Sequence, residues 1–199
     1  MILAIDSATA ACSAALIEDG EVAAERHELV GRGHAERLMP MIAELLAGRR
    51  PEAILVDCGP GSFTGLRVGL AAAHGLSIGW GIPVGGFSSM AVIAAASGAM
   101  PVTVALQGGH GELFVQSYGG VPLAPLDALR SLAPGAAAAA AAAPLVLGSG
   151  AQSLVAARGS GEWRDALPRA ADARLLPEGL RRLAPRPIYG RPPDARPRA

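Results

Sequence analysis

Residues 53–80 decide how this chain folds, and they read AILVDCGPGSFTGLRVGLAAAHGLSIGW. The apolar run Ala53–Val56 is typical of a buried strand. It leads into a loop that contains Gly59, Gly61 and Gly65, and a long segment rich in small residues follows. The stretch therefore predicts a strand, a glycine loop and a helix. Such a loop lets a backbone come very close to a phosphate, a substrate or another helix.

The regions on both sides of this stretch predict an α/β unit that opens with an antiparallel meander. Asp19-Gly20 is a hairpin signal between two apolar, strand-like runs. Thr64 is the expected N-cap of the helix that follows the glycine loop. The strand at 53–57 should run parallel to the first strand, because a helix connects them. We expect strands at 1–6, 12–18, 21–29, 53–57 and 83–87, and helices at 34–48, 64–80 and 88–97.

A second, smaller unit is expected after Pro101. Its predicted strands are 102–106, 112–118 and 145–147, and its predicted helices are 126–132 and 151–158. The alanine-rich segment 136–143 fits either a helix or an insertion. We expect the first subdomain to span residues 1–100, the second 101–184, and a Pro/Arg-rich tail 185–199.

Composition limits the classes of function. The 199 residues carry a formal net charge of zero and are 51% hydrophobic, which argues against a nucleic-acid binder that acts through bulk charge. All 17 basic residues are arginine, so no mechanism can use a lysine. Cys12 and Cys58 form neither a disulfide framework nor a metal motif. The N-terminus does not read as a signal peptide, and no run reads as a membrane span, so we expect a cytoplasmic protein.

Two interpretations of the glycine loop remain open from the residues alone. It lacks the spacing of a Walker phosphate loop and of the G-x-S-x-G elbow, and no histidine pair has metal-ligand spacing. Backbone N–H groups could still contact a phosphate. Alternatively, the small residues at every fourth position could allow close helix packing, within the fold or between chains. The candidates for a nucleotide or phosphate contact are Asp6, Ser7, Thr9, Gly61, Ser62 and Arg67.

Three segments together resemble the TsaB (YeaZ) family: ILAIDSAT, GHAERLMPMIAELL and GPGSFTGLRVGLAAAHGL. The resemblance implies a fold similar to actin, sugar kinases and Hsp70 ATPases (ribonuclease H-like), with two α/β subdomains and mixed sheets. It also implies a non-catalytic scaffold that pairs with the catalytic paralogue TsaD, joined by the ATPase TsaE. That complex transfers threonylcarbamoyl to the tRNA adenosine next to the anticodon. The resemblance implies no cofactor or metal of the chain's own, ATP or ADP at the junction with the partner, indirect tRNA contact and no membrane contact.

The family's pairing surface uses the two helices that match 34–48 and 64–80 here, and it often forms homodimers when the partner is absent. The interface residues implied are Leu38, Met41, Ile42, Leu45, Gly65, Leu66, Gly69 and Ala73. One departure is Gln107–His110, where the family usually has an Asp-Ala-Arg run. The alternatives are a stand-alone ATPase of this fold, a peptidase-like enzyme, and direct tRNA contact through arginines of the C-terminal region. The ATPase needs acids in both units, and the second offers only Glu112 and Asp127 early in its sequence.

Overall fold

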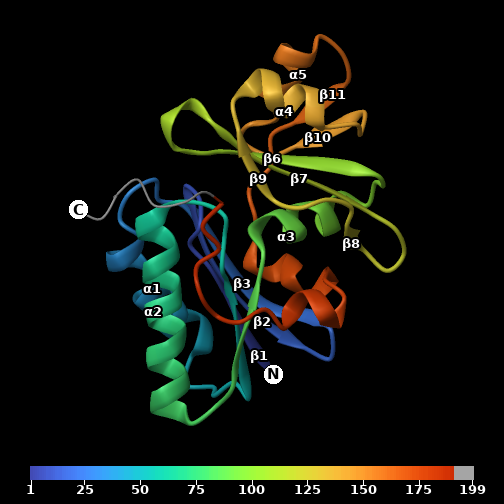
Figure 1. Ribbon diagram of the computed structural model, residues 1–199. Helices are drawn as coiled ribbons and strands as arrows, with labels where there is room; N and C mark the ends of the chain where they lie inside the picture. Colours follow the sequence, from blue (N-terminus) through green and yellow to red (C-terminus); the bar gives the residue numbers. More distant parts are fainter. Residues whose placement is uncertain (191–199) are drawn as a thin grey trace, which may run out of the picture.

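The computed structural model describes residues 1–190, which form two α/β units, one above the other in Figure 1. The sheet of the first unit has five strands in the order β3-β2-β1-β4-β5. β1, β2 and β3 form the expected antiparallel meander, and β1, β4 and β5 run parallel, which confirms a mixed sheet. The strands are β1 (Ile2–Asp6), β2 (Ala11–Glu18), β3 (Glu21–Leu29), β4 (Ala53–Asp57) and β5 (Val84–Phe87).

Helices cover both faces of this sheet. α1 (His34–Leu46) and α2 (Phe63–Trp80) lie together on one face, where Leu3 and Ile5 of β1 point toward them. α3 (Ser89–Ser97) lies on the other face, and Ala4 of β1 is buried in the core on that side. The alternation along β1 follows from the two-residue period of a strand. The helices of the first unit occur where the sequence predicts them, although Ser62, rather than Thr64, caps α2.

The second unit has a six-stranded sheet in the order β11-β10-β6-β7-β8, with β9 also paired to β7. Its strands are β6 (Val102–Gln107), β7 (Leu113–Gly119), β8 (Ala124–Pro125), β9 (Arg130–Leu132), β10 (Leu145–Leu147) and β11 (Glu162–Arg164). Its helices are α4 (Pro134–Ala140), α5 (Ala151–Arg158) and the short 3-10 turn η1 (Gly109–Gly111). The alanine-rich segment is therefore helical only in its first part.

The helix predicted at 126–132 is wrong: the chain bends at 126–127 and then forms β9, and hydrogen bonds connect this segment to β7. The Leu126 amide donates to the Ser117 carbonyl at 2.8 Å, and the Ser117 amide donates to Asp127 Oδ1 at 2.8 Å. β9 then pairs with β7 directly. Tertiary pairing of this kind overrides a weak local helix preference.

The end of the chain returns to the first unit. η2 (Ala170–Leu175) packs against β1, β2 and β3, and Ala170 is buried in one core with Ala4. After η3 (Glu178–Arg181), the Leu183 and Gly86 backbones pair. Within the expected second subdomain of residues 101–184, residues 170–183 contact strands of the first unit, and Ala170 and Leu176 lie in a core that includes residues of both units. Of the expected tail, residues 191–199 lie outside the described residues.

The glycine loop allows α2 to approach the turn after β1 very closely. A Cβ added to Gly61 would lie 2.1 Å from the Ala8 carbonyl oxygen, and one added to Gly65 would lie 2.1 Å from the Ser7 carbonyl oxygen. The Ser7 hydroxyl donates to the Gly65 carbonyl at 2.8 Å, and the Ser62 amide donates to the Ala8 carbonyl at 2.6 Å. These glycines are required because any side chain would separate α2 from the turn.

Two buried carboxyl groups, those of Asp6 and Asp57, lie at the ends of the adjacent strands β1 and β4. Asp6 Oδ1 accepts the Ala8 amide at 2.8 Å, and Asp57 Oδ1 accepts the Gly59 amide at 2.6 Å, so the pair fixes both turns. Burial, and then the charge of Asp57, raises the pKa of Asp6 well above its usual range. Burial raises the pKa of Asp57 to about 6, while hydrogen bonds from the Gly59 amide and the Ser89 hydroxyl oppose this rise. The raised pKa favours the protonated form of Asp6, which reduces the repulsion between the two buried carboxyl groups.

The close approach of α2 yields a matched pair of substitutions. Gly65→Ala should lower the free energy of unfolding by about 3 kcal/mol, because its Cβ meets backbone that cannot move freely. Gly75→Ala should raise it by about 0.5–1 kcal/mol, because that Cβ meets open space and alanine favours the helix. Urea unfolding measures both. A Gly65→Ala variant as stable as the wild type would contradict the close contact.

The acid pair predicts how stability depends on pH. Asp6 and Asp57 have raised pKa values in the folded protein, whereas both ionise near pH 4 in the unfolded chain. The protonated acids therefore contribute stability at low pH that is lost as the pH rises through the raised folded pKa values. Asp6→Asn mimics the protonated form and should stabilise the fold at pH 8 by about 1–3 kcal/mol, with a smaller gain at pH 5. Thermal unfolding at both pH values tests this. Glu18→Gln, at an exposed carboxylate, is the control; a destabilised Asp6→Asn variant at pH 8 would refute the raised pKa of Asp6.

Candidate functional site

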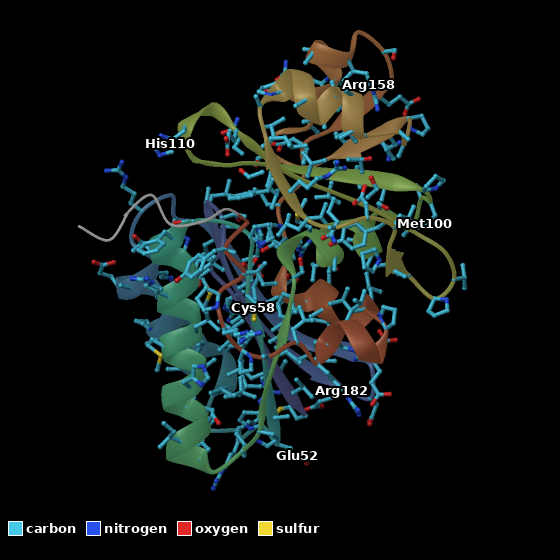
Figure 2. The ribbon with its side chains drawn as sticks, in the orientation of Figure 1. Glu52, Cys58, Met100, His110, Arg158 and Arg182 are labelled. Carbon is cyan, nitrogen blue, oxygen red and sulfur yellow. The ribbon has the colours of Figure 1, made fainter. Side chains whose placement is uncertain are left out.

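A cleft of about 950 Å³ lies between the two units. Its lower wall comes from the turn at 8–10 and from the start of α2, and its upper wall comes from residues 106–109 with Phe114 and Ser149. The segment 188–190 closes one side. In Figure 2, His110 marks the loop of the second unit above this region, and Cys58 marks the end of β4 below.

The structure brings four of the six predicted phosphate-contact residues to this cleft. They are Thr9, Gly61, Ser62 and Arg67. The other two, Asp6 and Ser7, are buried, and neither lines the cleft. The Ser7 hydroxyl is already bonded to α2, and Asp6 Oδ1 accepts the Ala8 amide of its own turn.

Phe63, Arg67 and Tyr189 form a cluster at the cleft, which the sequence did not predict. The guanidinium carbon of Arg67 lies 3.7 Å from the centre of the Phe63 ring, and Arg67 Nη2 donates to the Tyr189 hydroxyl at 3.3 Å. The Phe63 and Tyr189 rings lie 6.0 Å apart between centroids. Phe63 stands directly beside the predicted Ser62, so its position in the motif was the available signal. Tyr189 lies 122 residues from Arg67 in sequence, which no local pattern reveals.

The acids named for an ATPase are bonded elsewhere. Glu112 accepts the Ser131 hydroxyl at 2.6 Å, and Asp127 accepts the Ser117 amide. Within residues 1–190, no three His, Cys, Asp or Glu side chains group as a potential metal site. His34 and Ser62, which a peptidase-like mechanism would use, also have structural roles: His34 Nε2 lies 2.9 Å from the Thr9 carbonyl oxygen, and Ser62 Oγ caps α2. No helix among these residues is long and apolar enough to cross a membrane.

The interface residues implied by the resemblance face the wrong way for pairing. Their apolar stripes pack into the core of the first unit, as expected when an amphipathic helix lies on a sheet. Gly69 is likewise directed inward, because a Cβ there would lie 2.5 Å from Ser7 Oγ. All eight implied interface residues are buried. Six of them have side chains exposed by 2% or less, namely Leu38, Met41, Ile42, Leu45, Leu66 and Ala73, and the other two are Gly65 and Gly69.

The opposite faces of the same helices are exposed, and besides the charged Glu36 and Glu44 and the polar His74 they carry a set of small and apolar residues, here called the outer face. Its residues are Ala35, Met39 and Ala43 of α1 and Ala71, Gly75, Ile78 and Gly79 of α2. Ile78 is 83% exposed. A Cβ added to Gly75 or Gly79 would meet no atom within 4 Å, so nothing within the fold requires these two glycines. The small residues spaced along α2 were visible in the sequence, but the sequence could not show which of the glycines faced inward.

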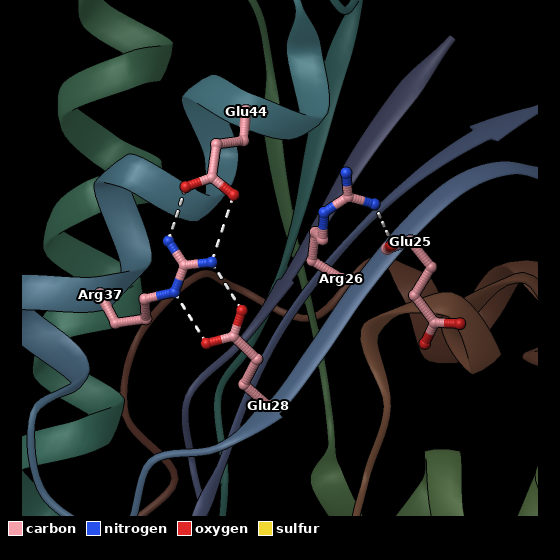
Figure 3. Close-up of polar contacts among 5 residues, drawn as sticks. All are labelled: Glu25, Arg26, Glu28, Arg37 and Glu44. Atoms are coloured by element: carbon pink, nitrogen blue, oxygen red, sulfur yellow. Dashed lines mark hydrogen bonds and ion pairs between the residues drawn. The ribbon is translucent and has the colours of Figure 1, made fainter.

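Ion pairs fix α1 against the edge of the first sheet, as Figure 3 shows. The Arg37 guanidinium donates to both carboxylate oxygens of Glu28 on β3, at 2.7 and 2.6 Å, and also to Glu44 on α1 at 2.8 Å. These hydrogen bonds lower the pKa of Glu28 and of Glu44. The outer face is therefore presented on a helix whose position is well defined.

Comparisons with known proteins agree with this architecture. A sequence model of the family "tRNA N6-adenosine threonylcarbamoyltransferase" (TsaD) matches residues 21–158. The TsaB protein of Escherichia coli is 39% identical over 126 residues, which are 59% of this chain and 54% of that protein. The chain thus spans about half the length of this relative. An uncharacterized protein of Mycobacterium tuberculosis is 34% identical over the whole chain and 95% of its own length.

Two solved structures from Pseudomonas aeruginosa share the fold. One, described as an uncharacterized protein with similarity to peptidase YEAZ, has a TM-score of 0.81 at 29% identity and covers 96% of this chain and 99% of its own. The other, YeaZ, has a TM-score of 0.75 at 29% identity, over 87% of this chain and 89% of its own. The predicted two-unit α/β fold is confirmed. The chain belongs to the tRNA N6-adenosine threonylcarbamoyltransferase family and, within it, to the TsaB (YeaZ) group.

Proposed function

We propose that this chain takes part in threonylcarbamoyladenosine formation as a non-catalytic subunit that pairs with a TsaD paralogue. In this proposal the paralogue transfers the threonylcarbamoyl group to the tRNA adenosine next to the anticodon. The observation that carries the proposal is the outer face of α1 and α2. The names of the relatives support a role in threonylcarbamoyladenosine biosynthesis, and the exposed outer face supports pairing with another protein.

The outer face is better suited to a protein partner than to water. A glycine inside a helix costs about 1 kcal/mol relative to alanine, and Gly75 and Gly79 serve no contact within the fold. Small residues at these positions would let a partner helix approach closely, with Met39 and Ile78 as apolar anchors. The inner faces cannot pair, because they are already buried in the core.

The positions of the acids support a subunit without catalysis of its own. A carboxylate that holds a metal-bound phosphate must be ionised and reachable. Asp6 and Asp57 are buried and their pKa values are raised, and no acid among residues 1–190 lines the cleft. Contact with tRNA, with the TsaE ATPase and with ATP or ADP would then come through the complex. Without the TsaD paralogue, the same outer face would pair two copies of the chain.

Gly75→Arg should abolish pairing without unfolding the chain. Its Cβ enters open space, and the long charged side chain then blocks close approach to the outer face. The variant should lose at least tenfold of the co-purified TsaD paralogue. In the organism that carries this chain, depletion of the chain should lower the threonylcarbamoyladenosine content of tRNA, measured by nucleoside mass spectrometry. The wild type, but not Gly75→Arg, should restore it.

Gly135→Arg is the matched control, because it also places arginine at an exposed helical glycine with open space around its Cβ, but in α4 of the second unit. It should pair and complement like the wild type. Gly69→Arg is unsuitable as a pairing test, since its side chain would disturb the monomer. Wild-type co-purification of Gly75→Arg would refute the interface, and an unchanged modification level after depletion would refute the function.

A further inference from the structure

α1 contains a proline in its interior, on the side that faces away from the sheet. Pro40 lies inside the helix His34–Leu46 and is exposed. A proline at such a position removes one helical hydrogen bond and destabilises the helix. Pro40 takes no part in the core beneath α1, so nothing in the described part of the fold requires a proline there.

The missing N–H of Pro40 leaves the Glu36 carbonyl without its usual partner. In an α-helix the carbonyl of one residue accepts the amide of the residue four positions later, and a proline has no amide hydrogen. Among residues 1–190, no donor from outside α1 bonds the Glu36 carbonyl. Glu36 and Pro40 are both exposed, so a donor from another protein can reach this oxygen. α1 therefore presents a free backbone acceptor on its exposed side.

The carboxylate of the same residue adds a negative charge. Within the described residues, Glu36 forms no ion pair, and its side chain is exposed. The adjacent Arg37 is already held by Glu28 at 2.6 Å and by Glu44 at 2.8 Å, as Figure 3 shows. A free carbonyl close to an unpaired carboxylate favours a donor that carries a positive charge.

The exposed side of α1 cannot supply such a donor to a second copy of itself. Its exposed side chains are those of Ala35, Glu36, Met39, Pro40, Ala43 and Glu44. None of these has an N–H or O–H donor when the glutamates are ionised. On α2, Arg67 donates to Tyr189 and His74 donates to the Pro185 carbonyl. A different chain, with an arginine or lysine opposite Glu36, would satisfy both acceptors.

We propose that the Glu36 carbonyl, left free by Pro40, and the Glu36 carboxylate together bind an arginine or lysine side chain of the TsaD paralogue. The inference rests on the proposed pairing through the outer face, since Glu36 and Pro40 lie on α1 next to Met39. The basic side chain donates to the carbonyl, and the carboxylate attracts its charge. This contact makes the paralogue a better partner than a second copy of the chain.

Pro40→Ala tests the carbonyl, because alanine supplies the missing amide hydrogen. In the isolated chain it should raise Tm by roughly 5–10 °C, since the helix regains a hydrogen bond. It should weaken binding to the TsaD paralogue about tenfold in isothermal titration, as expected for the loss of one charge-assisted hydrogen bond. Self-association, measured by analytical ultracentrifugation, should not weaken. A more stable chain that binds its partner less tightly excludes unfolding as the cause.

Glu36→Gln tests the charge, because it keeps the shape of the side chain. It should weaken binding to the paralogue about threefold at low salt and less at high salt, where the attraction is screened. Pro134→Ala and Glu162→Gln are the matched controls in the second unit. Pro134 is at the start of α4, where its amide would have no helical partner, and Glu162 is exposed on β11. Both controls should bind the paralogue like the wild type.

Wild-type affinity of Pro40→Ala or of Glu36→Gln for the paralogue would overturn the proposal. So would an equal loss of self-association, because a second copy would then use the same acceptors. Gly75→Arg in the same titration separates this failure from that of the proposed function. If Gly75→Arg fails to bind while Pro40→Ala binds normally, the pairing stands and the acceptor site is refuted. If Gly75→Arg binds normally, both are refuted.

Discussion

The contact between α2 and the turn at Ser7–Ala8 determines how the first unit presents its surfaces. Gly61 and Gly65 bring the helix so close to this turn that their added Cβ atoms would overlap its carbonyl oxygens. With the glycine face fixed inward, the opposite face of α2 must point away from the sheet, beside that of α1. The same contact places Ser62, Phe63 and Arg67 along the cleft. One packing constraint thus positions both the outer face and the lower wall of the cleft.

The buried acid pair lies beneath this contact and serves the two turns that meet there. Asp6 and Asp57 each accept a backbone amide of the turn that follows their strand. Burial raises the pKa values of both carboxyl groups, which favours the uncharged form of Asp6 and reduces the cost of burying them together. Each acid therefore stabilises the turn that follows its strand.

Sequence reasoning recovered the elements of the first unit, because their periodicity and turn residues are strong. It could not assign the faces of α2. Gly65 and Gly75 are both helical glycines, and only the position of the helix over β1 shows that the first is packed and the second is open. The stripe that includes Leu38 was likewise read as an interface when it is core. The helix predicted at 126–132 does not form, because pairing of β9 with β7 overrides the local preference for a helix. Tyr189 reaches Arg67 only through the returning chain, which no local pattern encodes.

The central claim is that the outer face of α1 and α2 becomes buried in the complex. Met39 on this face is 45% exposed, and Met100, next to the start of the second unit, is 39% exposed, so the two side chains form an internal comparison. Peroxide oxidation of both, followed by mass spectrometry, should be measured with and without the TsaD paralogue. The account predicts that the paralogue slows oxidation of Met39 several-fold and leaves Met100 unchanged. An unchanged rate at Met39 in a formed complex, or protection of Met100 alone, would contradict it.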